Sequence, residues 1–240
     1  MCGRFAITLP PEAVRQYFAF AERPNFPARY NIAPTQPIPV VTAKEHSHGL
    51  DRHFHLVRWG LWPSFVKDPR EFPLIINARA EGIAAKPSFR NALKRRRWIA
   101  IADGFYEWRK PTDGVKAAKT PFLIRRRSGE PLAFAALGET WSDPNGGEVD
   151  TACIITTRAN CLMSAVHDRM PVILEPENFS AWLDCDGVSA GEAERLLEPA
   201  AEKTLELVPV STAVNRVAND DPSLQEPLGE AIRTQSSNST

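Results

Sequence analysis

Short apolar runs that do not alternate regularly with helical segments constrain the fold of this 240-residue chain most. The runs are rich in β-branched and aromatic residues, which favour strands. The predicted strands cover residues 4–8, 39–42, 54–59, 74–78, 98–102, 105–108, 121–126, 132–137, 152–157, 172–174 and 205–210. Without βα units or internal repeats, this pattern predicts one sheet-dominated α+β domain. We expect mixed, mainly antiparallel strands and a few peripheral helices.

Helices are predicted at residues 11–20, 87–96, 176–183 and 190–197. Five prolines in residues 23–39 predict an ordered loop, because proline fixes φ and removes a backbone donor. Residues 60–73 form a second predicted loop, whose aromatic side chains could stack on bases. We predict one domain over residues 2–234 and a disordered tail at 235–240.

Composition excludes several classes of protein. The chain has no apolar run long enough to span a bilayer and no signal-peptide pattern, so we expect an intracellular, cytoplasmic protein without a membrane partner. Its formal net charge is zero, which argues against a uniformly basic coat for nucleic acid. The cysteines lack metal-binding spacing, so neither a disulfide framework, a zinc site nor a cofactor is predicted.

Two local patterns allow opposing interpretations. His46, His48, His53 and His55 suggest a metal site, but the lack of acidic or thiolate partners favours an exposed hairpin between residues 39 and 59. The basic runs at residues 94–97 and 125–127 could hold a phosphate backbone. Each run alone fits a solvated helix face or strand edge better.

The N-terminal tetrapeptide Met1-Cys2-Gly3-Arg4 can carry chemistry. Excision of the initiator methionine is normal before a small residue, and it would leave Cys2 with a free α-amine beside its thiol. Such an aminothiol captures an aldehyde as a Schiff base and then closes a thiazolidine ring. The amine has a pKa of about 7.7–8.0, so a useful fraction is unprotonated at neutral pH. The alternative is that Cys2 begins a buried strand.

Further candidate residues lie beside predicted strands. Glu107 shares a strand face with Phe105, and burial would favour its protonated form as a proton donor, although an arginine partner is the alternative. His167 lies in a polar turn and could move protons near pH 7, although a lone histidine is more often structural. Asn77 and Arg79 alternate on one face and could donate hydrogen bonds to a sugar or a phosphate.

Six separated sequence blocks resemble one family. They are Met1-Cys2-Gly3-Arg4-Phe5, Arg29-Tyr30-Asn31-Ile32-Ala33-Pro34-Thr35, Trp59-Gly60-Leu61, Ile76-Asn77-Ala78-Arg79-Ala80-Glu81, Ala102-Asp103-Gly104-Phe105-Tyr106-Glu107-Trp108 and His167-Asp168-Arg169-Met170-Pro171. In this order they are similar to the motifs of the SOS response-associated peptidase (SRAP) family of abasic-site processing proteins. The resemblance covers about residues 2–225.

The resemblance implies a reversible covalent crosslink to abasic sites in single-stranded DNA, which shields the lesion. Cys2 would be the nucleophile, Glu107 the acid/base and His167 a proton carrier, while Asn77 would orient the Cys2 amine or the sugar. The implied DNA contacts are Arg4, Asn31, Phe65, Arg79, Arg90 and Thr156. The implied partner is single-stranded DNA with an abasic site, junctions with duplex included, and the implied state is a monomer. Where a relative has two tryptophans, this chain has Phe65 and Val66, so base stacking could differ.

Two other functions stay open on the sequence. An N-terminal cysteine peptidase or amidase could use Cys2 activated by His167 or Glu107, and self-removal of Met1 would be consistent with it. A plain single-stranded nucleic-acid binder would use Arg96, Arg97, Arg125 and the aromatic loop. It would bind with strong salt dependence and would not distinguish a missing base.

Overall fold

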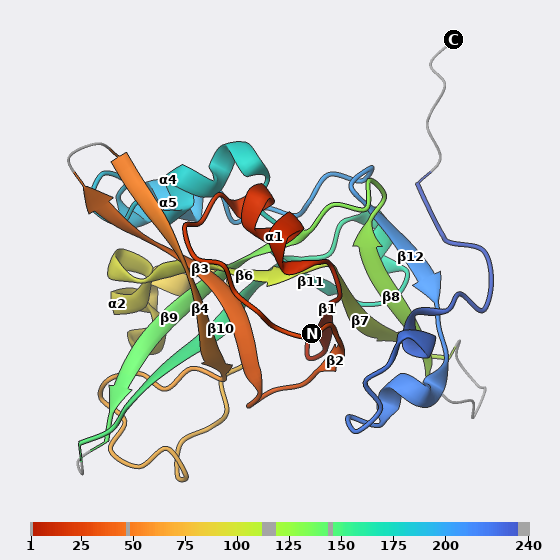
Figure 1. Cartoon of the computed structure of the whole chain (residues 1–240), viewed down its shortest axis with the longest axis horizontal. Coiled ribbons are helices and arrows are strands. Elements are labelled where there is room, and N and C mark those ends of the chain that lie inside the picture. Colours follow the sequence, from red (N-terminus) through yellow and green to blue (C-terminus); the bar gives the residue numbers. More distant parts are fainter. Residues whose placement is uncertain (1, 47–48, 112–118, 144–145, 235–240) are drawn as a thin grey trace.

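Figure 1 shows the computed structural model, which describes residues 2–46, 49–111, 119–143 and 146–234. The predictions for Met1, His48 and the tail at 235–240 lie outside these residues. The strands are β1 (Phe5–Ile7), β2 (Arg29–Ile32), β3 (Pro37–His46), β4 (Gly49–Trp59), β5 (Asn77–Arg79), β6 (Arg97–Ala102), β7 (Gly104–Arg109), β8 (Thr120–Arg126), β9 (Leu132–Ser142), β10 (Glu148–Arg158), β11 (Arg169–Pro171) and β12 (Leu205–Pro209).

The helices are short and lie outside the sheets (Figure 1). The α-helices are α1 (Pro11–Phe18), α2 (Pro87–Arg95), α3 (Cys161–Ser164), α4 (Phe179–Leu183) and α5 (Ala190–Glu194). Four 3-10 helices, counted within the described residues, are η1 (Ile83–Ala85), η2 (Pro176–Asn178), η3 (Thr212–Asn215) and η4 (Pro222–Gln225). None of the helices in the described part of the chain is both long and apolar enough to cross a membrane.

Two sheets build the domain. A five-stranded sheet has the order β12–β8–β7–β1–β2, and a seven-stranded sheet has the order β11–β10–β4–β3–β6–β9 with β5 attached to β10. Because β9 also pairs with β10, the path β4–β3–β6–β9–β10 closes on itself. Strand β10 runs parallel to β4 and β5, while the other strand pairs of the described residues are antiparallel. The predicted α+β domain with mainly antiparallel strands is confirmed.

Alternation along β7 separates two hydrophobic clusters. Phe105 belongs to the main cluster, to which both sheets contribute. Tyr106 belongs to a smaller cluster that also contains Val214 and Leu224 from the C-terminal segment. Since successive side chains of a strand point to opposite faces, Glu107 shares the face of Phe105. The strand therefore directs a buried carboxylic acid toward the main core.

Most predicted elements are present with shifted ends, but the loop predicted at residues 23–39 is partly wrong. Strand β2 forms there because Ile32 pairs with Phe5 and Arg29 with Ile7. Strand β3 begins at Pro37 in spite of its prolines. Pro37 and Pro39 precede the part of β3 that pairs with β6. At these two positions β3 pairs with β4 alone, so the side of the strand that faces away from β4 needs no backbone N–H donor.

Two strand predictions are displaced. The strand predicted at 74–78 forms at Asn77–Arg79, where it pairs with β10. The strand predicted at 172–174 forms at Arg169–Pro171, and Ile173 makes an isolated bridge to Phe134 instead. In both cases the position of a partner strand sets the ends, and local apolar character does not reveal that position.

Candidate active site and nucleic-acid interface

Cys2, Asn77 and Glu107 come together from three separate parts of the chain. Cys2 is fully buried in the main cluster. The pairing of Phe5 with Phe105 brings the start of the chain beside the end of β7, where Glu107 lies. Asn77 opens β5 and donates a hydrogen bond from Nδ2 to the Cys2 carbonyl oxygen, at 2.8 Å. Three of the four predicted catalytic side chains thus surround one point.

This environment sets the protonation of the thiol. Burial, and next the negative charge of Glu107, raise the pKa of the Cys2 thiol far above its ordinary value. The Cys2 thiol therefore keeps its proton at neutral pH. Asn77 Oδ1 is buried and has no hydrogen-bond partner among the described residues. A buried oxygen without a partner is rare in native structures, and it can accept a hydrogen bond from a bound group.

The chain changes face at Gly3. Phe5 and Ile32 face the main cluster, so Arg4 and Asn31, their neighbours in the two paired strands, face the other side of the five-stranded sheet. Cys2 would face that side too if alternation continued, yet it lies in the main cluster. Cys2 and Arg4 consequently lie at the same end of β1, on opposite faces of the five-stranded sheet.

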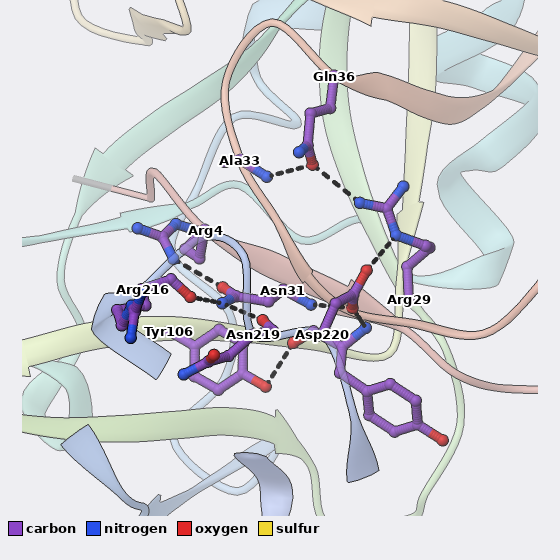
Figure 2. Close-up of polar contacts among 10 residues, drawn as sticks. Arg4, Arg29, Asn31, Ala33, Gln36, Tyr106, Arg216, Asn219 and Asp220 are labelled. Carbon is purple, nitrogen blue, oxygen red and sulfur yellow. Dashed lines mark hydrogen bonds and ion pairs between the residues drawn. The ribbon is translucent and has the colours of Figure 1, made fainter. Parts of the chain in front are cut away.

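Arg4 is held by buried partners (Figure 2). Its Nη1 donates to Asn31 Oδ1 at 2.7 Å, the bond that Figure 2 shows, and to the Val214 carbonyl at 2.9 Å. Its guanidinium carbon lies 5.8 Å from the centroid of the Trp108 ring. Burial lowers the pKa of the Arg4 guanidinium, which nevertheless stays charged at neutral pH. Arg4 therefore presents a fixed positive charge at the start of β1.

Two predicted phosphate contacts are themselves buried. Asn31 Nδ2 donates to the carbonyl oxygens of Val214, Arg216 and Asn219. Thr156 Oγ1 lies 3.4 Å from the Ala78 carbonyl oxygen. Both side chains are fully buried, so neither presents a surface to DNA in this structure. Their direct contact with phosphate stays a prediction.

The other predicted DNA contacts are exposed. Arg79 ends β5 opposite Thr156 of β10, and Arg90 lies on the outer face of α2. The Phe65 side chain is 58% exposed, with its ring centroid 6.1 Å from that of Phe72. Val66, by contrast, is buried, and its carbonyl accepts from Trp141 Nε1 at 2.7 Å. Position 66 therefore supports the loop from inside, and Phe65 alone of this pair is open to stacking.

His167 lies two residues before β11, which pairs with β10 on the side opposite to β5. Its Nδ1 is 3.0 Å from the Arg169 backbone nitrogen and 2.8 Å from Asp168 Oδ1. An N–H of Arg169 can only donate, whereas a contact to the carboxylate requires a proton on Nδ1, so the two contacts imply different protonation states. The Asp168 side chain is 87% exposed, and we therefore assign the backbone bond and a proton on Nε2.

Several arginines of the two basic runs are bound by other parts of the protein. Arg97 is buried and donates to the carbonyls of Trp182, Leu93 and Val188. Arg125 pairs with Glu206 at 2.9 Å, and Arg126 with Glu175 at the same distance. The prediction that Arg97 belongs to a nucleic-acid-binding surface is therefore wrong, because its guanidinium is buried and already donates hydrogen bonds to backbone carbonyls.

The histidine cluster has an acidic partner after all. His53 Nδ1 lies 2.8 Å from Glu22 Oε1, a residue that the sequence does not place nearby. His55 is exposed on β4, as expected for a hairpin. Within the described ranges, no three His, Cys, Asp or Glu side chains are arranged to hold a metal ion. The four cysteines are free thiols.

Sequence reasoning missed the C-terminal residues that contact β2 and β7 beside Arg4. Asp220 accepts hydrogen bonds from the backbone nitrogens of Tyr30 and Asn31 and from Arg29 Nε (Figure 2). Trp108 Nε1 donates to Asn215 Oδ1 at 2.7 Å. The Asp220 contacts join residues about 190 positions apart and the Trp108 contact residues 107 positions apart, so no local pattern signals either.

Comparison with known proteins places the chain in a family. The family described as SOS response associated peptidase (SRAP) matches residues 1–217. The abasic site processing protein YoqW of Bacillus subtilis is 37% identical over 94% of this chain and 99% of its own. YedK of Escherichia coli, named in the same way, is 32% identical over 95% of this chain and 100% of its own. This chain belongs to the SRAP family.

A solved structure agrees with the fold. A crystal structure of a protein from Bacteroides thetaiotaomicron superimposes with a TM-score of 0.81 at 24% identity. The match covers 94% of this chain and 99% of the other. At this identity the likeness concerns the fold alone.

Proposed function

We propose that this protein recognises abasic sites in single-stranded DNA and joins itself to them through Cys2 once Met1 has been removed. The name that its relatives share, abasic site processing protein, supports the lesion as the target. The observation that carries the covalent step is the buried group of Cys2, Asn77 and Glu107. Its chemistry fits the capture of an aldehyde.

The reaction balances without an oxidant or reductant. A ring-opened abasic sugar carries an aldehyde at C1′, and the α-amine of Cys2 adds to that carbon. Loss of water gives an imine. Cys2 Sγ then bonds to the same carbon while the thiol proton ends on the nitrogen, which closes a thiazolidine. Reversal follows the same steps backwards and restores both the aldehyde and the free terminus.

Each neighbouring side chain has a role in moving these protons. Since the Cys2 thiol is protonated at neutral pH, a base must take its proton as sulfur attacks, and the Glu107 carboxylate is the adjacent base. The same acid can open the sugar ring by giving a proton to the ring oxygen. Asn77 fixes the Cys2 backbone, and its free Oδ1 can accept a hydrogen bond from the amine or the sugar. His167, with its proton on Nε2, assists at the imine.

The thiol decides between shielding the lesion and cutting the strand. An imine at C1′ acidifies the neighbouring carbon, and β-elimination then breaks the DNA backbone. Ring closure removes the imine and with it this route. An N-terminal amine without a thiol would therefore cleave, whereas Cys2 holds the strand intact.

The test is a crosslinking assay with processed protein, after an intact mass has established that Met1 is absent. A single-stranded oligonucleotide with one abasic site should give an adduct that survives denaturation. Cys2→Ala should give none and should instead nick the strand slowly. Cys161→Ala is the matched control, because it removes an exposed thiol far along the chain. An abasic site reduced to the alcohol should not react. Wild-type protein that forms no adduct, or an adduct with Cys2→Ala, would overturn the proposal.

A peptidase is the second candidate, because the family description contains that word. Cysteine peptidases use a thiolate with a lowered pKa, whereas the pKa of the Cys2 thiol is raised. We therefore expect no turnover of an external peptide under conditions in which the abasic oligonucleotide is crosslinked. Turnover that disappears in Cys2→Ala would favour the peptidase.

A further inference from the structure

The C-terminal segment, residues 211–225, is fastened to the sheet beside Arg4. Val214 of η3 and Leu224 of η4 are buried against Tyr106 in the smaller hydrophobic cluster. The segment therefore covers the face of the five-stranded sheet that the main core does not use (Figure 1). Burial anchors its two ends, and the residues between them form hydrogen bonds with β2.

Asn31 and Asp220 fix the part of the segment between these anchors. The two N–H groups of the Asn31 amide serve three carbonyls, those of Val214 at 3.2 Å, Arg216 at 3.0 Å and Asn219 at 2.8 Å. In the opposite direction, the Asp220 carboxylate accepts hydrogen bonds from backbone nitrogens of β2. The backbone around Arg216 is consequently held on both sides, and its position does not depend on a ligand.

Arg216 projects from this fixed backbone. Its side chain is exposed and makes no hydrogen bond or ion pair with any described residue. One amide group, that of Asn31, separates the Arg216 carbonyl from Arg4 Nη1. Figure 2 shows Arg216 on the same side of that amide as Arg4. Two arginines thus share one support.

Arg4 has donors left for a ligand. A guanidinium offers five N–H donors, and the hydrogen bonds of Arg4 to described residues all leave from Nη1. No carboxylate of the described residues forms an ion pair with Arg4 or Arg216. Two arginines whose backbone or side chain is held by the same Asn31 amide, and which pair with no acid of the described residues, can gain by binding an anion, and arginine forks match the oxygens of a phosphate.

We propose that Arg216 is a second phosphate contact, which with Arg4 forms a two-arginine clamp on the DNA backbone next to the lesion. Asn31 and Asp220 are positioning residues that act through this clamp. The inference rests on the proposed binding of single-stranded DNA. It also assigns a use to Asn219 and Asp220, which lie beyond the residues 1–217 that the family describes.

The experiment is a salt titration with an undamaged single-stranded oligonucleotide, so that binding is measured without crosslinking. Each phosphate contact contributes a slope of about 0.7 to the fall of log K with log salt, so at 0.1 M salt one lost contact weakens binding by about 5-fold. We expect this loss and this change of slope for Arg216→Ala. Arg216→Lys should keep most of the slope. Arg127→Ala is the matched control, an exposed arginine at the opposite end of β8 from Trp108.

A double-mutant cycle tests the positioning role. In an Asp220→Ala background, Arg216→Ala should weaken binding by less than 2-fold, because the segment no longer holds the side chain in place. Circular dichroism of each variant checks that the fold is retained. Arg216→Ala with the wild-type slope would overturn the clamp, and full additivity with Asp220→Ala would overturn the positioning.

Failure of this inference differs from failure of the proposed function. Wild-type protein that crosslinks abasic DNA while Arg216→Ala binds like the wild type refutes the clamp alone. Wild-type protein that binds undamaged strands with the expected Arg216 dependence, but forms no adduct, refutes the crosslink alone. Absence of any single-strand binding by the wild type refutes both.

Discussion

Replacing Asn31 by alanine should destabilise the fold more than its location on a short edge strand suggests. The side chain is fully buried and takes part in four hydrogen-bond contacts, with Arg4, Val214, Arg216 and Asn219. Its two N–H groups are shared by three carbonyls, so the contacts count as about three effective bonds, each with a net value of about 1 kcal/mol. Asn31→Ala should therefore cost about 3 kcal/mol of unfolding free energy.

Urea denaturation measures this loss. With a denaturant dependence of about 3 kcal/mol per M, appropriate to a large domain, the midpoint should fall by about 1 M. Asn91→Ala is the matched control, since Asn91 is exposed on α2, and a change there should stay within about 0.5 kcal/mol. Asn31→Asp separates donor from acceptor, because it keeps an oxygen for Arg4 but sets a second oxygen against the three carbonyls. It should be no more stable than Asn31→Ala. An Asn31→Ala midpoint equal to that of the control would refute this account of the network.

Two further outcomes follow from the core and the site. Glu107→Gln removes the charge that helps to raise the pKa of the Cys2 thiol, so this pKa should fall and alkylation of Cys2 above pH 8 should become faster. Crosslinking should be lost, because the variant lacks the carboxylate base. Timed iodoacetamide labelling followed by peptide mapping measures the alkylation, and Cys2 labelled no faster than in the wild type would contradict the prediction. Gly138→Ala would place a Cβ 2.2 Å from the Trp98 ring and should lower the free energy of unfolding by about 1–3 kcal/mol, as measured by thermal unfolding. Gly191→Ala on α5 is the control, because its Cβ would meet no atom within 4 Å and should be neutral or stabilising. Equal melting temperatures for the two variants would refute the packing argument.

The sequence predicted the class of fold because alternation and β-branched runs report burial on one strand at a time. It also predicted which face of β7 carries Glu107, since that needs the strand period alone. It did not predict β2, because β2 depends on pairing with β1 about 25 residues away, within a stretch whose prolines argue for a loop. Pairing partners are a tertiary property, and they set the ends of β5 and β11 as well.

The candidate site, too, was predicted from the sequence in part only. Family motifs indicated Cys2, Asn77 and Glu107, and the fold brings these three together. The motif containing Asn31 indicated a phosphate contact, whereas in the structure the Asn31 side chain donates hydrogen bonds to three carbonyls of the C-terminal segment. A motif marks that a residue type is needed at a position. It does not say whether the residue meets the ligand or supports another residue that does.

Gly3 connects the two halves of the site. Because the chain changes face there, Cys2 enters the main core while Arg4 faces the C-terminal segment. If Arg4 holds DNA as proposed, the strand has to pass the N-terminal end of β1, which lies between β7 and β2, to bring a sugar to Cys2, and an abasic nucleotide does so without a base. An intact nucleotide would have to bring its base as well as its sugar to Cys2, which is fully buried. On this reasoning the preference for a missing base is steric, and it should persist in Cys2→Ala as tighter non-covalent binding to abasic than to intact strands.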